Sequence, residues 1–180
     1  LFNGANIAEN IDISANGGHA LLTRDIAGIT MDLDNVVTIQ LNTLGGTDTV
    51  TVNDLTNTDV RQVNLDLGVN GVGDGQVDTV VINATSGDDV IVLTNNNGVV
   101  TVSGLATTTT ISGFDANDRI VINGLGGDDV IEASGLNGML LTANGGVGDD
   151  ILIGSHGNDT LNGDAGDDVL IGNGGIDVLN

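Results

Sequence analysis

Residues 145–180 read GGVGDDILI GSHGNDTLN GDAGDDVLI GNGGIDVLN, which is four consecutive nonapeptides with no residue left over. Every copy has Gly at positions 1 and 4, Asp at position 6 and Leu at position 8. A fixed short period is typical of repeat architectures, in which each unit buries its apolar side only by stacking on its neighbours. The stretch therefore predicts a stacked, coiled fold.

Each nonapeptide is expected to form a turn followed by a strand of three residues. The Leu at position 8 should point into the core, while positions 7 and 9 point outward, because side chains alternate along a strand. Two nonapeptides then make one coil with a turn on each edge. The turns of the first and third copies should stack on one edge, and those of the second and fourth on the other.

A degenerate form of the repeat continues upstream. Residues 124–132, GLGGDDVIE, resemble the last nonapeptide, and 120–132 aligns with 80–92 at a spacing of 40. Residues 39–51 align with 80–92 at a spacing of 41, which places Asp48, Asp89 and Asp129 in equivalent positions. The simplest interpretation is one coil of roughly 18–21 residues, seen here at double spacing.

Short segments with β-branched residues in alternation lie between these turns, and they predict strands. They are VTIQL, TVTV, TVVIN, VIVL, VTVSG and RIVING, with IDIS and ITMDLD nearer the N-terminus. The expected fold is all-β, a right-handed parallel β-solenoid. Residues 1–35 form a cap or a first coil, 36–123 form degenerate solenoid repeats, and 124–180 form the regular repeat region.

The composition fits a thin aliphatic core and an acidic surface. Two Phe are the only aromatic residues, and Pro and Cys are absent. The formal net charge is −22, from 25 acids against three basic residues. Binding to nucleic acid or to an anionic membrane is therefore not expected, because phosphates require cations opposite them. No apolar run is long enough to span a bilayer, so membrane insertion is not expected either.

The regular placement of Asp indicates a bound cation. Strands of neighbouring coils lie about 4.8 Å apart, so the stacked carboxylates would repel each other strongly without one. Calcium accepts six to eight oxygen ligands, including carbonyls, whereas magnesium is smaller and retains its waters. Zinc prefers nitrogen and sulfur, and this chain has two His and no Cys.

The nonapeptides resemble those of the repeats-in-toxin (RTX) family, also called haemolysin-type calcium-binding repeats. The resemblance covers 124–132 and 145–180 and implies that the solenoid ends in a calcium-binding parallel β-roll. In that family each ion lies between two stacked turns and is bound by carbonyls of positions 1 and 3 of one turn, carbonyls of positions 2 and 4 of the next, and both Asp side chains.

Transferred to this sequence, the family pattern implies three calcium sites. The first consists of Gly145, Val147 and Asp150 with Asp164, Gly166 and Asp168. The second consists of Gly154, His156 and Asp159 with Asn173, Gly175 and Asp177. The third consists of Gly124, Gly126 and Asp129 with Gly146, Gly148 and Asp150. His156 is expected to contribute its carbonyl, and Asp149 and Asp167 at position 5 are expected to face solvent.

The resemblance also implies a protein secreted to the extracellular space or cell surface, exported unfolded by a Gram-negative type I route. No catalytic motif is present, so an enzyme is not expected. Two roles stay open: a structural or adhesive module of an adhesin, matrix fibre or surface layer, or an accessory module of a secreted enzyme or toxin that aids export or binds polysaccharide. Homo-oligomers or fibres could form through an open solenoid end or through an outward apolar face of Ile151, Ile153, Val169 and Ile171.

Overall fold

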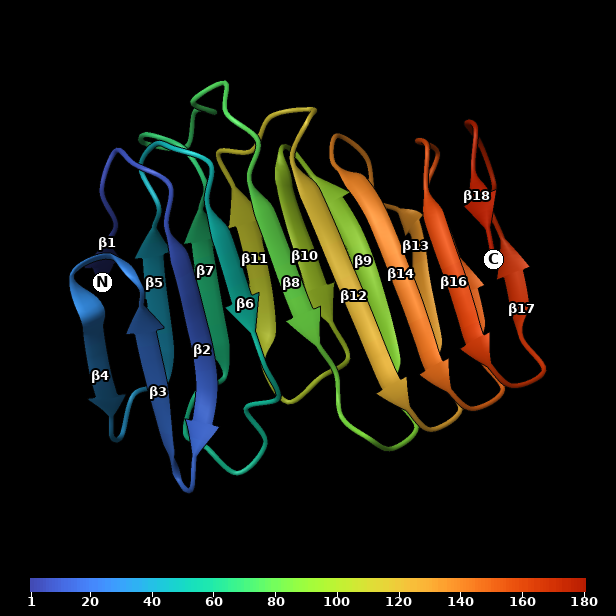
Figure 1. Cartoon of the computed structure of the whole chain (residues 1–180), viewed down its shortest axis with the longest axis horizontal. Coiled ribbons are helices and arrows are strands. Elements are labelled where there is room, and N and C mark those ends of the chain that lie inside the picture. Colours follow the sequence, from blue (N-terminus) through green and yellow to red (C-terminus); the bar gives the residue numbers. More distant parts are fainter.

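The computed structural model describes residues 1–180, which form two nine-stranded sheets that face each other along the length of the molecule (Figure 1). In spatial order, the front sheet contains β18 (Val178–Leu179), β16 (Thr160–Ala165), β14 (Leu140–Val147), β12 (Arg119–Gly126), β8 (Thr79–Asn83), β6 (Thr49–Val52), β2 (Asn10–Asn16), β3 (His19–Arg24) and β4 (Ile29–Leu33). The back sheet contains β1 (Phe2–Asn3), β5 (Thr38–Asn42), β7 (Gln62–Asp66), β11 (Thr108–Ser112), β10 (Val99–Ser103), β9 (Val90–Asn96), β13 (Val130–Gly135), β15 (Ile151–Ile153) and β17 (Val169–Ile171).

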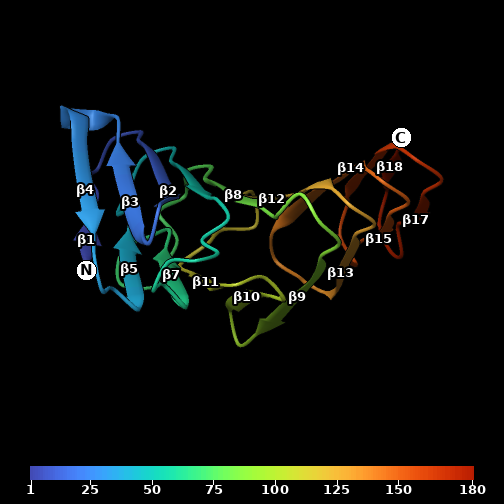
Figure 2. The ribbon, with the colours of Figure 1, turned by 90° about the horizontal axis from the view of Figure 1, so that it is seen from below.

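Most neighbouring strands are parallel, because the chain crosses from one sheet to the other and back in each coil. Figure 2 shows the two sheets as opposite walls of a flattened coil. Alternate residues of most strands point between the walls and, with loop residues such as Leu55 and Leu136, form one core of 31 buried hydrophobic residues. The predicted all-β parallel solenoid is thus confirmed. The one helical segment is η1 (Ile26–Gly28), and no helix is long and apolar enough to cross a membrane.

The prediction that one coil of 18–21 residues is seen at double spacing is wrong for the upstream region. β12 pairs directly with β8, residue 119 opposite residue 79, so the 40 residues between them make a single coil. That coil is long because β9, β10 and β11 form an antiparallel meander within the back sheet. Coils of 21 and 18 residues occur only from β12 onward.

The proposed equivalence of Asp48 with Asp89 and Asp129 is also wrong. Asp48 precedes β6 of the front sheet, whereas Asp89 and Asp129 precede β9 and β13 of the back sheet. The turns therefore lie on opposite edges, which we call the upper and lower edges as they appear in Figure 1. Asp48 is aligned instead with Asp78 and Asp118, which precede β8 and β12.

An asparagine ladder holds the front sheet in register despite the unequal coils. The side-chain amide of one Asn in each coil donates a hydrogen bond of 2.6–2.8 Å to the corresponding side chain of the preceding coil. The ladder runs through Asn180, Asn162, Asn144, Asn123, Asn83 and Asn53 and ends on the carboxylate of Asp12. Such ladders reinforce the backbone bonds between stacked strands.

The N-terminal region contributes to both sheets. β1 pairs with β5 in the back sheet and β2 pairs with β6 in the front sheet, both in parallel. β3 and β4 then extend the front sheet as an antiparallel meander at its N-terminal end (Figure 1).

Candidate metal centre

The nonapeptide turns stack as predicted. On the lower edge, the turns 124–129, 145–150 and 163–168 each connect a front strand to a back strand and lie one above another. On the upper edge, 154–159 and 172–177 connect back strands to front strands. The first and third copies therefore share one edge, and the second and fourth share the other.

Of the position-8 residues, Leu152 and Leu161 are fully buried, whereas Leu170 is partly buried and Leu179 is 48% exposed. The expected inward orientation is thus clear in the first two copies. Leu170 and Leu179 lie in β17 and β18, the strands at one end of the two sheets.

Glycine at position 1 leaves room beside the carboxylate of position 6. A Cβ on Gly124, Gly145 or Gly163 would lie well inside van der Waals contact with Oδ2 of Asp129, Asp150 or Asp168 in the same turn. At Gly124 the same Cβ would also approach the carbonyl of Gly145, which is position 1 of the next turn. A carboxylate oxygen and a carbonyl oxygen of two coils thus converge on a space that only glycine leaves open.

The position-6 aspartates form a ladder along the lower edge. The backbone N–H of Asp89 donates to Oδ1 of Asp129, that of Asp129 to Oδ1 of Asp150, and that of Asp150 to Oδ1 of Asp168, at 2.8–2.9 Å. Each bond uses one carboxylate oxygen only. Oδ2 of Asp129 and Oδ2 of Asp150 are buried and have no hydrogen-bond partner. An unsatisfied buried carboxylate oxygen is costly, and a cation bound beside it would satisfy it.

The electrostatics of this ladder disfavour the ionised form of its carboxylates. Burial raises the pKa of Asp129 to about 6, and the neighbouring charge of Asp150 adds to the rise. Burial likewise raises the pKa of Asp150, to which the charge of Asp168 contributes. Without a cation, the folded chain therefore resists ionisation of the side chains that the turns bring together.

The upper-edge pair is more fully satisfied within the protein. The backbone N–H of Asp159 donates to Oδ1 of Asp177 at 3.0 Å, as on the lower edge. However, Ser155 at position 2 donates from both its N–H and its hydroxyl to the Asp159 carboxylate. Asn173 donates its side-chain amide to the carbonyl of Gly154, one of the predicted ligands. The side chains at position 2, Ser155 and Asn173, therefore contact groups of the predicted upper-edge site directly.

The predicted ligands fall into stacked pairs of turns, but side chains alone do not make a site. No three His, Cys, Asp or Glu side chains lie close enough to hold a metal ion by themselves. A calcium ion here would need carbonyls of both turns, as the family pattern implies. Leu125 lies opposite Gly146, and Gly126 lies opposite Val147. Gly127 also donates its N–H to the Val147 carbonyl at 2.9 Å. The positions whose carbonyls are the predicted ligands are therefore in register between the two turns. His156 is exposed. The individual ligand assignments stay predictions.

The exposed aspartates of position 5 form a second ladder that the sequence did not reveal. The N–H of Asp149 donates to Oδ1 of Asp128, and the N–H of Asp167 donates to Oδ1 of Asp149, at 2.9–3.0 Å. Their direction is opposite to that of the position-6 ladder. Asp149 and Asp167 are solvent-exposed as predicted, although they also contribute one bond per coil.

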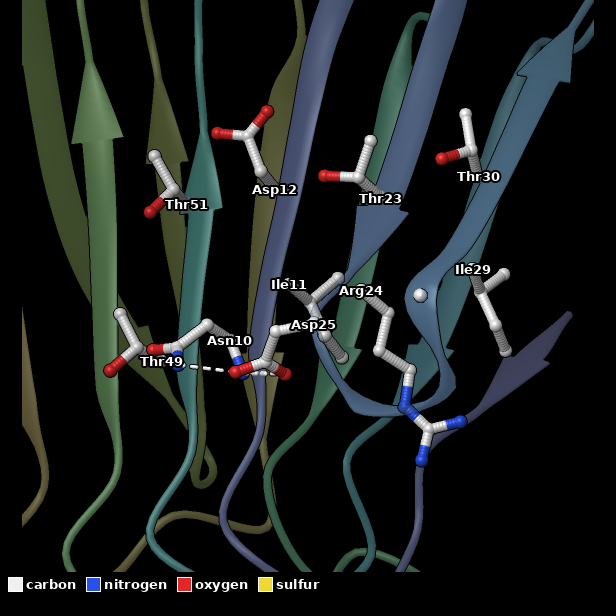
Figure 3. Close-up of a pocket in the computed structure, with 11 residues that line it drawn as sticks. Asn10, Ile11, Asp12, Thr23, Arg24, Asp25, Ile29, Thr30, Thr49 and Thr51 are labelled. Carbon is white, nitrogen blue, oxygen red and sulfur yellow. Dashed lines mark hydrogen bonds between the residues drawn. The ribbon is translucent and has the colours of Figure 1, made fainter.

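The largest hollow in the molecule, of about 400 Å³, lies far from the nonapeptides, on the outer face of the front sheet around β2, β3, β4 and β6 (Figure 3). Thr23, Thr30, Thr49 and Thr51 stand around it, and Asn10 donates to Asp25 at its base. Only two of its eleven lining residues are hydrophobic.

The stacked turns, the converging oxygens and the two parallel sheets together define a calcium-type β-roll. Residues 144–179, in the C-terminal part of the chain, match the family model of the RTX calcium-binding nonapeptide repeat in four copies. Repeats of this family bind Ca²⁺. No curated protein and no solved structure matches the chain.

The residues present fit such an ion. The unpartnered Oδ2 atoms of Asp129 and Asp150 and the open space at Gly124 and Gly145 supply hard oxygens and room for it. When bound, calcium would neutralise the carboxylates that approach each other across the coils.

Proposed function

We propose that this chain is a calcium-folded structural module of a secreted bacterial RTX-type protein, of the kind used in an adhesin, a matrix fibre or a surface layer. The observation that carries the proposal is the pair of buried, unpartnered carboxylate oxygens of Asp129 and Asp150 within stacked repeat turns. Extracellular calcium is in the millimolar range that weak extracellular sites require, so several ions bind only after export. Type I export of the unfolded chain is part of the same proposal.

A structural role is also supported by the outer surface of the back sheet. Val90, Val130, Ile151 and Val169 are directly opposite one another on four neighbouring strands. Ile153 and Ile171 form a second, shorter row. Val90 is 58% exposed, Val169 49% and Ile171 44%. We call these six residues the aliphatic face. The aliphatic face is longer than the sequence alone indicated, because β9 pairs with β13 and places Val90 directly beside Val130.

Contiguous exposed aliphatic residues usually mark a contact surface. We propose that a second copy of the chain covers the aliphatic face, since a flat row of β-branched side chains is complementary to an identical row. Burying each side chain would contribute roughly 1.5–3 kcal/mol.

The double substitution Ile151→Asp with Ile171→Asp is expected to abolish self-association while the calcium-bound fold persists. Both side chains point outward, so the change places charge on the contact surface and leaves the core intact. Sedimentation velocity in saturating calcium gives the readout, with circular dichroism to verify the fold. Thr142→Asp with Thr160→Asp, an aligned outward pair on the front sheet, is the control. Equal association of both double variants and the wild type would exclude the aliphatic face.

The second candidate is an accessory module of a secreted enzyme or toxin that binds polysaccharide. The polar hollow of Figure 3 favours it, because threonine hydroxyls and the Asn10 and Asp25 side chains suit sugar hydroxyls. In both candidates the chain itself is proposed to have no catalytic activity, since its buried acids are explained by cation binding.

A further inference from the structure

The asparagine ladder of the front sheet meets the lower-edge turns in a recurring dipeptide. Asn123, Asn144 and Asn162 are each followed directly by the glycine that begins a turn. The asparagine supplies the side-chain hydrogen bonds of the ladder. The glycine leaves the space beside the position-6 carboxylate, which a Cβ would fill. The two requirements together place Asn–Gly in each of the strands β12, β14 and β16.

An asparagine that precedes glycine is open to attack by its own backbone, because glycine has no Cβ and the widest choice of backbone angles. The glycine nitrogen forms a bond to the side-chain Cγ of the asparagine. The bond from Cγ to the amide nitrogen then breaks, and ammonia leaves with the proton of the backbone N–H. Water opens the resulting five-membered succinimide to aspartate or isoaspartate. The net reaction is deamidation, with uptake of water and release of ammonia.

The fold holds these three dipeptides away from the reaction. Ring closure requires the glycine nitrogen to turn toward the asparagine side chain, whereas a parallel strand holds ψ at about +115° and keeps that nitrogen rotated away. The Asn144 amide is also fixed on both sides, because its Nδ2 donates to Asn123 at 2.7 Å and its Oδ1 accepts from Asn162 at 2.6 Å. The nitrogen of Gly163, which would attack Asn162, already donates its proton to the Asn180 carbonyl at 3.0 Å.

The Asn–Gly dipeptide of the β2–β3 hairpin lacks this protection. Asn16 is the last residue of β2, and both Asn16 and Gly17 are exposed. Gly17 begins the turn with a φ of 66°, and a Cβ built on it would meet no atom within 4 Å. Asn16 therefore serves as an internal reference for an Asn–Gly pair at an open surface of the folded chain.

We propose that Asn123, Asn144 and Asn162 are deamidation sites that the stacked fold protects and that loss of calcium exposes. The calcium trigger rests on the proposed calcium-dependent folding. The product carboxylate has no N–H to donate to the preceding coil. Isoaspartate also adds a carbon atom to the main chain, so the residues after it no longer match their partners in the sheet. A chain modified while unfolded therefore cannot rebuild the ladder, and prolonged withdrawal of calcium becomes irreversible.

Peptide mapping by mass spectrometry measures the protection on the whole chain. The protein is incubated at mildly alkaline pH in saturating calcium, in chelator or in urea, and circular dichroism records the fold in each. In calcium, we expect the three ladder sites to be modified at least about tenfold more slowly than Asn16, because the reaction there requires local opening of a strand. In urea, all four sites should react at comparable rates, and in chelator the ladder sites should react as they do in urea.

Asn83 is the matched control within the ladder. Its amide donates to Asn53 at 2.8 Å and accepts from Asn123 at 2.7 Å, but the next residue is Ala84, whose Cβ hinders the attack. Asn83 should react more slowly than the three sites in urea. Ladder sites that react as fast in calcium as in urea, with native circular dichroism in calcium, would overturn the proposal. A native fold and protected sites in chelator would instead refute the calcium trigger and the proposed calcium-dependent folding, while the protection itself is decided by the calcium and urea incubations.

Two variants with the same charge change test the consequence for refolding. Asn144→Asp places a carboxylate opposite Oδ1 of Asn123, whereas Asn16→Asp places one on the exposed hairpin. Calcium titrations followed by circular dichroism compare them. We expect Asn144→Asp to raise the calcium concentration at the midpoint of folding severalfold and Asn16→Asp to keep the wild-type midpoint. Equal midpoints for both variants and the wild type would show that a deamidated ladder refolds, and would overturn the proposed irreversibility.

Discussion

Removal of calcium with a chelator is expected to convert the chain from β structure to a largely disordered state, with a cooperative return at sub-millimolar to millimolar calcium. The reason is electrostatic: 25 acids face three basic residues, and two carboxylate oxygens of the array are buried without a partner. If each site has a dissociation constant near 10⁻⁴ M, millimolar calcium adds about 1.4 kcal/mol per site. Several sites together rival a typical folding stability of about 5–15 kcal/mol. Far-ultraviolet circular dichroism measures the transition.

Two controls separate calcium from general charge screening. Magnesium at equal concentration should not restore the fold, because it needs a smaller, nearly octahedral site. In chelator, lowering the pH from about 7 to about 5 should restore part of the β signal. Burial raises the pKa of Asp48 and of Asp129 to about 6 and that of Asp78 to about 7 in the folded chain. The folded chain therefore takes up protons more readily than the unfolded chain, so a lower pH favours folding. A full native signal in excess chelator at neutral pH would refute the calcium dependence.

Asp150→Ala is expected to have the largest effect of any single substitution in the array. It should raise the calcium concentration at the midpoint of folding by about tenfold or more, because a loss of about 1.4 kcal/mol of binding free energy corresponds to tenfold in affinity. The Asp150 carboxylate accepts a hydrogen bond from the N–H of Asp129, and the N–H of Asp150 donates to the carboxylate of Asp168. Asp150 therefore belongs to both predicted sites of the lower edge. Asp168→Ala removes a ligand from one site and should have a smaller, still marked effect. Calcium titrations followed by circular dichroism rank the variants.

The position-5 residues provide matched controls within the same turns. Asp149→Ala and Asp167→Ala remove the same charge, but these side chains are exposed and each accepts at most one hydrogen bond from a neighbouring turn. Their midpoints should change only slightly. Position-5 variants as damaging as the position-6 variants would show that the carboxylates have been assigned one residue out of register.

The repeat region was predictable because its period is short and exact. Each nonapeptide places Gly and Asp at fixed positions, which determines the stacking of turns 145–150 and 163–168 and the burial of Leu152 and Leu161. The strands at 49–52, 79–83 and 119–126 were also indicated by alternation of β-branched residues. Local pattern and stacking energy agree in these segments.

The upstream coils were less predictable because their pairing is decided by tertiary contacts. β9 and β10 are joined by a two-residue turn of Asn97 and Gly98, and the φ of 53° at Asn97 suits a tight hairpin. The resulting 40-residue coil is about as long as two short coils, so spacing alone does not distinguish them. The asparagine ladder was hidden because its members are 18 to 41 residues apart. Spacing alone does not show which edge of a solenoid a residue occupies, so Asp48 was assigned to the wrong one.

Anomalous X-ray diffraction from crystals grown with calcium would locate the proposed ions between the stacked turns. We expect one anomalous peak between turns 124–129 and 145–150 and another between turns 145–150 and 163–168. Each peak should lie within about 2.3–2.6 Å of oxygen atoms from both turns, including the carboxylates of Asp129 and Asp150. Crystals in which these spaces contain only water, with the coils stacked as described, would contradict this expectation.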